Sequence, residues 1–173
     1  MKRRIKHVTV LGSGIMGSGI AAHFANIGVE VLLLDIVPFE LTEAEQKKGL
    51  TKEDKAVRNR IATESLAKLV KASPALLYKK EFAERISVGN FDDDLPKIKN
   101  TDWIIEVVVE RLDIKKSVYE KIEQFRKPGT LVSSNTSGIP INMLVEGRSD
   151  DFKKYFAGTH FFNPVRYLPL LEI

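Results

Sequence analysis

Three glycines near the amino terminus stand between an apolar run and a helical pattern. The apolar run Val8–Leu11 leads into a GxGxxG motif formed by Gly12, Gly14 and Gly17. Eighteen residues after Gly17, a second apolar run ends in Asp35. The alternative is an accidental glycine turn. Here, however, a predicted strand precedes the glycines, a predicted helix follows them, and Asp35 stands at the spacing of a dinucleotide-binding βαβ unit. The sequence therefore predicts a parallel sheet whose first turn faces a pyrophosphate.

The residue types of this motif match the geometry that a phosphate site needs. Gly12 permits a tight turn, and Gly14 lacks a Cβ, so that a phosphate can approach the backbone closely. Gly17 lets the following helix pack against the strand. Free N–H groups at the start of that helix, near Ile15 and Met16, then point at the phosphates.

Asp35 predicts which dinucleotide is bound. Its carboxylate would accept hydrogen bonds from the hydroxyls of the adenine ribose. A 2′-phosphate at that position would meet a like charge, and no Lys or Arg within 36–39 neutralises it. The predicted cofactor is therefore NAD rather than NADP.

Strand and helix patterns alternate along the rest of the chain. Strands are expected at 5–11, 29–34, 85–88, 103–107, 131–134 and 155–160, and helices at 15–27, 115–125 and 141–145. The nearly continuous apolar run 103–109 is typical of a parallel strand covered on both faces. The chain is thus predicted to be α/β, with a doubly wound, mostly parallel sheet of the Rossmann type in one domain, 1–173.

About fifty residues separate Asp35 from the strand at 85–88, which is too long for a plain crossover. The segment Thr51–Asp54 has the form of a cap for a long helix that runs to about Lys71. This helix has an apolar face, formed by Ile61, Ala62, Leu66, Leu69 and Val70. The opposite face is charged and carries Arg60, Glu64, Lys68 and Lys71. We expect a helical arm over about 40–84, inserted after the second strand. It is either a solvated helix that packs by its apolar side or an arm that holds an anionic substrate.

Charge and cysteine content exclude several classes of site. The chain has no cysteine, which excludes disulfides, thiolate zinc sites and a cysteine nucleophile, and no metal site is predicted. The net charge of +4 is spread over interleaved basic and acidic residues, without the basic stripe of a nucleic-acid-binding protein. The basic start 1–6 leads into a strand, and no apolar run reaches the length of a membrane span. We expect a soluble cytoplasmic protein with no nucleic-acid or membrane partner.

A second cluster of chemically capable residues lies near the carboxyl end. His160 ends a predicted strand, which is where open α/β sheets bind ligands, and Glu172 follows twelve residues later. Pro164 and Pro169 lie between them, so that the chain must turn. One interpretation is a return strand that places the carboxylate against the imidazole and makes a general base suited to neutral pH. The alternatives are a His that only satisfies a hydrogen bond and, for the polar run Ser134–Gly138, an ordinary turn with a helix cap.

Five segments, in order, resemble the NAD-binding domain of the 3-hydroxyacyl-CoA dehydrogenase family. They are GSGIMGSGIA at 12–21, the strand end at Asp35, VERLDIK at 109–115, SNTS at 134–137, and HFFNP at 160–164 with Glu172. The resemblance implies that His160 takes the proton from the 3-hydroxyl of the substrate as hydride leaves the same carbon. It also implies that Glu172 orients His160 and stabilises its imidazolium, and that Ser137 hydrogen-bonds the substrate near the nicotinamide.

The same resemblance implies further contacts with both ligands. Cofactor contacts fall on Glu110, Lys115, Ser137 and Asn163, and substrate contacts on Ser65, Lys71 and Asn135. Two positions depart from the family pattern. Ala72 stands where the family has a lysine, with Lys71 adjacent, and Arg111 replaces the usual asparagine.

The activity that the resemblance implies is oxidation of (S)-3-hydroxyacyl-CoA to 3-ketoacyl-CoA by NAD, in the β-oxidation of fatty acids. Family members continue into a helical domain that covers the acyl chain, forms the homodimer and supplies a catalytic asparagine. We expect that domain to be missing from this chain, which would then bind NAD with little or no dehydrogenase activity. The alternatives are a dehydrogenase for a related hydroxy acid without coenzyme A, and a non-enzymatic NAD-binding structural protein. The joint presence of His160, Glu172 and Ser137 argues against the last of these.

Overall fold

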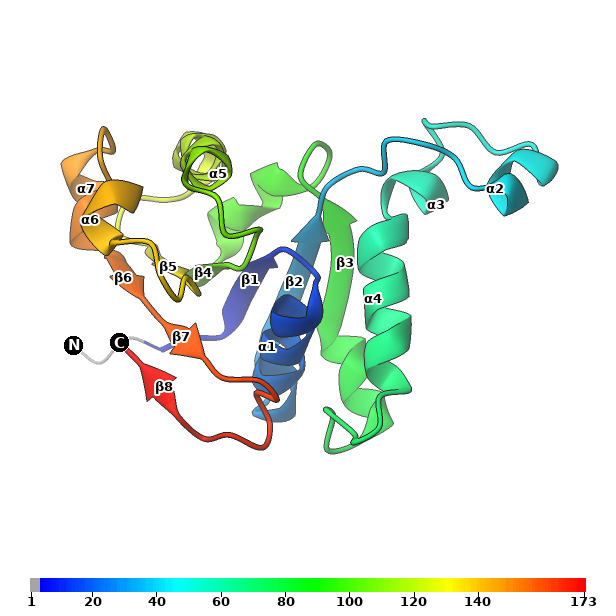
Figure 1. The fold of residues 1–173 in the computed structure, drawn as a ribbon, viewed down its shortest axis with the longest axis horizontal. Helices are drawn as coiled ribbons and strands as arrows, with labels where there is room; N and C mark the ends of the chain where they lie inside the picture. Colours follow the sequence, from blue (N-terminus) through cyan, green and yellow to red (C-terminus); the bar gives the residue numbers. More distant parts are fainter. Residues whose placement is uncertain (1–3) are drawn as a thin grey trace.

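Six strands form one parallel sheet in the order β3-β2-β1-β4-β5-β6 (Figure 1). The computed structural model describes residues 4–173, so that the first three residues of the basic start lie outside the described residues. The strands are β1 (His7–Leu11), β2 (Glu30–Asp35), β3 (Ile86–Asn90), β4 (Trp103–Glu106), β5 (Leu131–Ser134) and β6 (Phe156–Gly158). The chain builds outward from β1 first to one side and then to the other, which is the predicted doubly wound topology.

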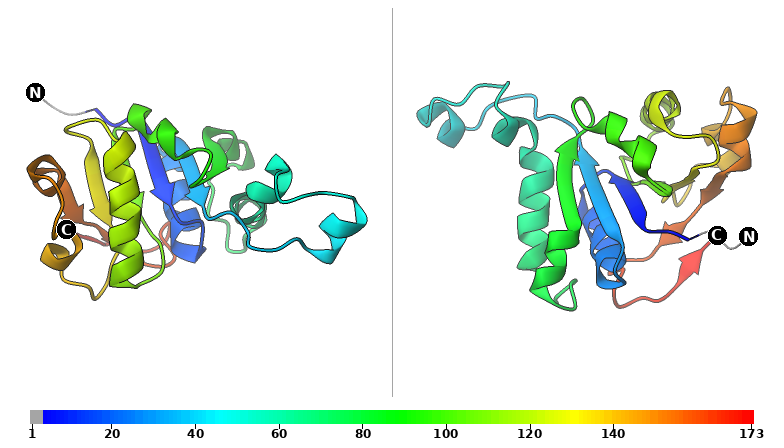
Figure 2. Two further views of the ribbon diagram at one scale, coloured as in Figure 1. Left: turned by 90° about the horizontal axis from the view of Figure 1, so that it is seen from above. Right: turned by 180° about the vertical axis from the view of Figure 1, so that it is seen from behind.

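Helices cover both faces of this sheet. On one face lie α1 (Ile15–Asn26) and α4 (Arg60–Val70), and on the other lie α5 (Leu112–Phe125) and the 3₁₀ helix η2 (Leu95–Asn100). Seen from behind, β3, β2 and β1 stand in front of α1 (Figure 2). The side chains of consecutive strand residues point to opposite faces. Val10 therefore lies in the apolar core under α1, and Leu11 lies in the core under α5.

Two glycines of the motif are required by close backbone contacts. Gly12 has φ +104°, and a Cβ there would lie 2.6 Å from the carbonyl oxygen of Val107. A Cβ on Gly17 would lie 1.8 Å from the carbonyl oxygen of Gly12. Only hydrogen at these positions lets α1 start directly against the turn. At its other end, α1 stops before Gly28, whose φ of +85° is that of the predicted C-cap glycine.

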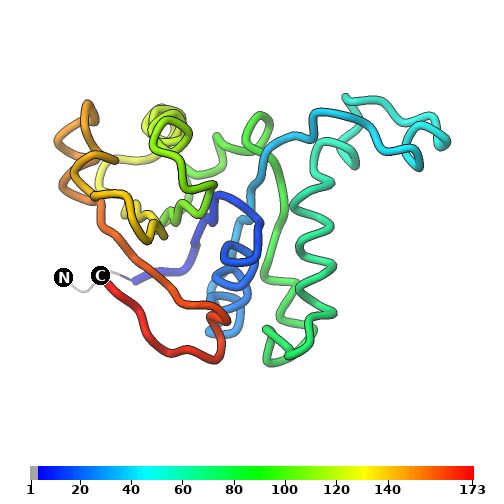
Figure 3. Tube along the Cα trace, in the orientation of Figure 1, coloured from blue at the N-terminus to red at the C-terminus, as the bar shows by residue number. Residues whose placement is uncertain are grey.

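The segment between β2 and β3 forms an arm, whose outer part, with α2 (Glu43–Lys47) and α3 (Lys55–Arg58), projects from the body (Figure 3). The rest of the segment, α4 and the 3₁₀ helix η1 (Lys80–Arg85), packs against α1 and β3. The prediction of one long helix up to Lys71 was wrong, because the helix breaks at Asn59. The backbone of Asn59 has φ −96° and ψ 4°. The side-chain oxygen of Asn59 accepts a buried hydrogen bond from the side-chain amide of Asn90 at 2.6 Å.

Two side chains of the arm also differ from expectation. Asp54 does not cap α3 with its side chain; its carboxylate instead accepts a hydrogen bond from the N–H of Thr51 at 2.6 Å. Arg60, which the helical pattern places on the exposed face, is half-buried because it pairs with Glu45 of α2 and donates to the carbonyl of Glu40. The apolar face packs as predicted, with Ala62 and Leu69 buried.

The last third of the chain departs from the predicted elements in detail. The strand expected at 155–160 is two strands, β6 and β7 (His160–Phe161), because the chain leaves the sheet at Thr159. β7 pairs with β8 (Leu171–Glu172) in a separate antiparallel ribbon. The short helix α6 (Ile141–Leu144) was expected, but α7 (Asp150–Lys154), which Ser149 caps, was not. Among residues 4–173, no helix has the length and apolar character needed to cross a membrane.

Candidate active site

The start of α1 is shaped to receive an anion. Gly14 is the N-cap residue, and within residues 4–173 no side chain accepts a hydrogen bond from the first turn. A Cβ on Gly14 would meet nothing within 4 Å, so that open space lies where a phosphate would approach. The exposed N–H groups and the positive end of the helix dipole favour negative charge there. The loop therefore fits a dinucleotide pyrophosphate.

Asp35 lies beside this loop at the carboxyl end of β2. Its Oδ2 accepts a hydrogen bond from the N–H of Ser13 at 2.6 Å, and its Oδ1 accepts one from the N–H of Ile36 at 2.7 Å. The parallel pairing of β1 with β2 brings the two strand ends together, with Leu11 opposite Leu34. The carboxylate is thus held where the adenine ribose of a bound dinucleotide lies in this fold.

His160 and Glu172 face each other across the β7–β8 ribbon. The two residues are directly paired, and Nδ1 of His160 lies 2.9 Å from Oε2 of Glu172. The return strand inferred from the twelve-residue spacing is therefore present. The imidazole is half-buried and the carboxylate is mostly exposed. A carboxylate in this position fixes the ring orientation and stabilises a positively charged imidazole.

The three predicted catalytic residues line one cavity of about 320 Å³. Ser137, His160 and Glu172 all line it, with Ile141 and Gly158 among its other walls. Its position between the loop after β5 and the β7–β8 ribbon leaves room for a small substrate group beside the imidazole. The structure thus places in one hollow three residues that are separated by up to 35 positions in the sequence.

Glu110 organises the loop that carries Ser137. Its Oε1 accepts hydrogen bonds from the N–H groups of Ser137 and Gly138 at 3.1 and 3.2 Å, and from the hydroxyl of Thr136. Partial burial raises the pKa of Glu110, but hydrogen bonds from Thr136 and Lys115 outweigh it, so that the net pKa is below the usual value. The ionised carboxylate therefore clamps the loop at neutral pH.

Beneath that loop lies a buried charged cluster that the sequence analysis did not predict. Nζ of Lys115 lies 2.7 Å from Oε1 of Glu106 and 3.2 Å from Oε2 of Glu110, and the side chains of Lys115 and Glu106 are 1% and 0% exposed. The other oxygen of Glu106 accepts hydrogen bonds from the hydroxyls of Tyr119 and Ser134, each at 2.6 Å. The available signal was a single glutamate inside the apolar run 103–109.

None of the four remaining candidates lines the cavity of His160. Asn135 ties the Ser137 loop to β7, since its side-chain oxygen accepts the N–H of Phe161 at 2.9 Å. Asn163 is exposed in the loop after β7. Ser65 lies against Ser13 of the phosphate loop, with 3.1 Å between their hydroxyl oxygens, and Lys71 is exposed after the end of α4.

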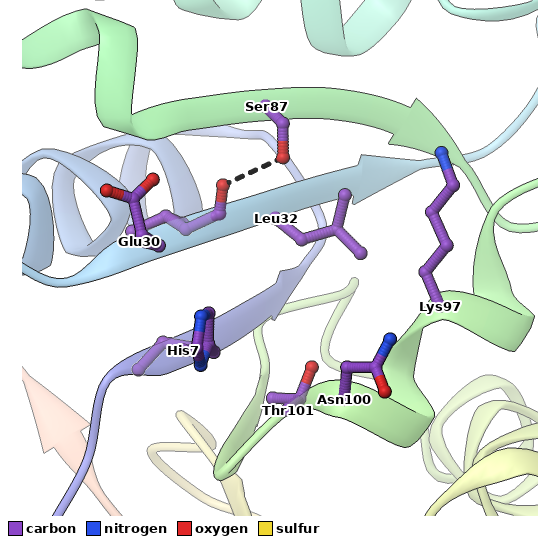
Figure 4. A pocket seen from close by; sticks show the side chains of 9 residues that line it. His7, Glu30, Leu32, Ser87, Lys97, Asn100 and Thr101 are labelled. Atoms are coloured by element: carbon purple, nitrogen blue, oxygen red, sulfur yellow. Dashed lines mark hydrogen bonds between the residues drawn. The ribbon is translucent and has the colours of Figure 1, made fainter.

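A second cavity, of about 260 Å³, lies on the sheet face away from α1 (Figure 4). Its walls include His7, Glu30, Leu32, Ser87 and Lys97, and the hydroxyl of Ser87 donates to the carbonyl of Val31 at 3.1 Å. It reaches the amino-terminal halves of β1 and β2, whereas doubly wound sheets bind ligands at the carboxyl ends. None of the predicted site residues lines it. Among the described residues, no group of acidic, His or Cys side chains forms a metal site.

The fold, the phosphate loop and the acidic end of β2 together define a dehydrogenase-type dinucleotide-binding domain. The family model of the 3-hydroxyacyl-CoA dehydrogenase NAD-binding domain matches residues 7–173, and the chain belongs to this family. Its cofactor is NAD. The predictions of fold class, family and cofactor are thereby confirmed.

Similar proteins agree with this assignment. The chain is 57% identical over its whole length to the "Probable 3-hydroxyacyl-CoA dehydrogenase" of Bacillus subtilis, of which it covers 22%. It is 45% identical, over 98% of its length, to a Deinococcus radiodurans protein of the same name, of which it covers 45%. The solved (S)-3-hydroxybutyryl-CoA dehydrogenase of Ralstonia eutropha matches with a TM-score of 0.68 and 30% identity, over 97% of this chain and 53% of that one. The chain thus spans about a fifth to a half of the proteins that it matches.

Proposed function

We propose that the chain is the cofactor-binding part of an enzyme that oxidises (S)-3-hydroxyacyl-CoA to 3-ketoacyl-CoA in fatty-acid breakdown. The observation that carries the proposal is the hydrogen-bonded pair of His160 and Glu172, in one cavity with Ser137. When bound, NAD supplies the acceptor for the hydride that leaves the 3-carbon of the substrate.

The histidine acts as the general base. Nδ1–H of His160 donates to Glu172 at 2.9 Å, which leaves the lone pair of Nε2 for the proton of the 3-hydroxyl. Loss of this proton, together with departure of the hydride from the 3-carbon, turns the hydroxyl into a carbonyl, and the imidazole gains a positive charge that the carboxylate of Glu172 stabilises. The hydroxyl of Ser137 hydrogen-bonds the same substrate oxygen and keeps it within reach of Nε2.

The cofactor is held from the other side of the site. The N–H groups at Gly14, Ile15 and Met16 bind the pyrophosphate, and Asp35 accepts from the ribose hydroxyls. Toward the nicotinamide, Glu110 and Asn163 make contacts from the loops after β4 and β7. Lys115, buried under the loop, acts through its ion pair with Glu110 rather than by direct contact.

The substrate and partner assignments rest on the family resemblance. Asn135, Ser65 and Lys71 are the candidate contacts to the substrate, with the arm of about 40–84 on the coenzyme A side. A helical domain beyond this chain covers the acyl group and joins two copies into a homodimer in the cytoplasm. Since this domain shields the site from water, the 173-residue chain alone has little dehydrogenase activity.

A hydroxy acid without coenzyme A is the second candidate substrate, because Ala72 replaces the family lysine. Initial rates of NADH formation by the full-length enzyme with a chain-length series of 3-hydroxyacyl-CoAs and with the free 3-hydroxy acids separate the two. A higher kcat/KM for a free acid would replace the proposed substrate.

Replacing the base tests the mechanism in the full-length enzyme. His160→Gln lowers kcat by about 10²–10⁴-fold, because proton transfer by a positioned base contributes that much. Glu172→Gln is also severe, since the imidazolium loses its counter-charge. NAD affinity, measured by calorimetry, stays near wild type in both variants. His7→Gln, at the exposed start of β1, is the matched control and keeps full activity. Near wild-type kcat in H160Q refutes the assignment.

A further inference from the structure

Ser13, between the first two glycines of the phosphate loop, has a hydroxyl with two neighbours. It is 1% exposed, and its Oγ lies 2.5 Å from Oδ2 of Asp35 and 3.1 Å from Oγ of Ser65. A serine hydroxyl carries one proton, so that it donates to one of these acceptors at a time. Ser13 and Asp35 are brought together by the pairing of β1 with β2, and Ser65 comes from α4 in the arm.

The carboxylate of Asp35 has few acceptor positions left for a ribose. A carboxylate offers about four lone-pair positions. Oδ2 already accepts from the N–H and the hydroxyl of Ser13, and Oδ1 accepts from the N–H of Ile36. One position therefore remains, whereas the 2′- and 3′-hydroxyls of an adenine ribose need two. The backbone donors belong to the turn itself, so that the hydroxyl of Ser13 is the donor that can leave.

Ser65 supplies the place to which that hydroxyl can turn. Its oxygen is already at hydrogen-bond distance, so that a rotation of the Ser13 O–H bond needs no movement of the backbone. Without Ser65, the buried hydroxyl of Ser13 would either keep its position on Asp35 or lose its acceptor. Both results make ribose binding less favourable.

We infer that Ser13 and Ser65 form a hydroxyl switch, in which the O–H bond of Ser13 turns from Asp35 to Ser65 when NAD binds. In this role Ser65 is a positioning residue for the adenosine half of the cofactor. The arm helix is thereby connected to the cofactor site by a hydrogen bond. The inference rests on the proposed contact between Asp35 and the ribose.

Cofactor analogues distinguish this switch from a general structural role. In calorimetric titrations of the chain, Ser65→Ala weakens NAD binding by roughly 3- to 10-fold, the range expected for one neutral hydrogen bond. Its affinity for an NAD analogue that lacks the adenosine 2′-hydroxyl is unchanged, because one ribose hydroxyl fits the free position on Asp35. Thr63→Ala, exposed on the same helix, is the matched control and changes neither affinity.

A double variant and a charge variant complete the test. In a Ser13→Ala background, Ser65→Ala has no further effect on NAD affinity, because the donor is gone. Equal weakening of binding for NAD and for the analogue in S65A, or no weakening of NAD binding in S65A, overturns the inference.

Asp35→Asn tests the ribose contact separately and reduces the preference for NAD over NADP. If it leaves that preference unchanged, the proposed ribose contact itself is wrong; if the preference shifts and S65A has no effect, only the switch is wrong.

Discussion

Gly14, the N-cap residue of α1, and Gly17, in its first turn, have opposite surroundings. At Gly14 an added Cβ has free space for 4 Å, whereas at Gly17 it would overlap the carbonyl oxygen of Gly12 at 1.8 Å. The first glycine therefore serves the ligand, and the second serves the fold. A substitution at Gly14 is therefore expected to affect NAD binding, and one at Gly17 to affect the stability of the fold.

Substitutions at these two glycines should separate binding from stability. Gly14→Val should abolish NAD binding while leaving the urea midpoint near wild type, because its branched side chain occupies the phosphate space. Gly17→Ala should lower the free energy of unfolding by about 1–3 kcal/mol, because α1 must move off the turn. Calorimetry and urea denaturation of both variants check this. Undiminished NAD binding in G14V would mean that the phosphate site lies elsewhere.

At the scale of elements, the buried cluster under the Ser137 loop connects three of them. Glu106 ends β4, Lys115 and Tyr119 come from α5, and Ser134 ends β5. Burial, and then the neighbouring charge of Glu106, raises the pKa of Tyr119, so that its hydroxyl stays a donor to that carboxylate. The loop that carries Ser137 is thus supported by four side chains that do not line the cavity.

Breaking this buried ion pair should cost far more than breaking a surface pair. Glu106→Gln should lower the free energy of unfolding by about 3–5 kcal/mol, because Lys115 loses its closest counter-charge in the interior. The double variant with Lys115→Met should recover part of the loss. Lys116→Met removes the exposed pair with Glu146 and should cost about 0–1 kcal/mol. A loss in E106Q no larger than that of K116M would contradict this account.

At the scale of the whole molecule, several carboxylates have lowered pKa values in the folded state. Hydrogen bonds from Thr136 and Lys115 outweigh the effect of burial on Glu110, and those from Ser149 do so for Glu123. The N–H of Gly129 lowers the pKa of Asp151; burial opposes this effect, and the hydrogen bond and charge of Arg126 lower the pKa further. A depressed folded-state pKa adds stability above the unfolded value, and that stability is lost as the pH falls through the folded value.

The melting temperature should therefore fall in acid. It should be nearly constant from pH 7 down to about 5.5 and decrease below the ordinary glutamate value of 4.5. Glu110→Gln should lower the melting temperature at pH 7, and this difference from wild type should shrink as the pH falls. Scanning calorimetry across this range provides the measurement, with exposed Glu64→Gln as control. A difference that stays constant in acid would show that the Glu110 charge adds no stability.

Local patterns were sufficient for the main features of the fold. The apolar run, the three glycines and Asp35 predicted the βαβ unit, because each depends on neighbours within a few residues or on one parallel pairing. The twelve-residue spacing from His160 to Glu172, with two prolines between them, made their contact one of the alternatives, and the family resemblance selected it. The doubly wound sheet followed from the alternation of strand and helix patterns.

Tertiary structure alone decided the features whose partners are remote in the sequence. The helix of the arm breaks at Asn59, where the side chain is hydrogen-bonded to Asn90, 31 residues away. Glu106 carries a charge inside an apolar strand because α5 brings Lys115 to it, and no periodicity records that pairing. Ser65, which the family resemblance associates with the substrate, lies against Ser13 of the phosphate loop because α4 packs along β2 and β3. A sequence specifies its own periodicity and turns directly, but buried polar partners are chosen only when packing has set which elements meet.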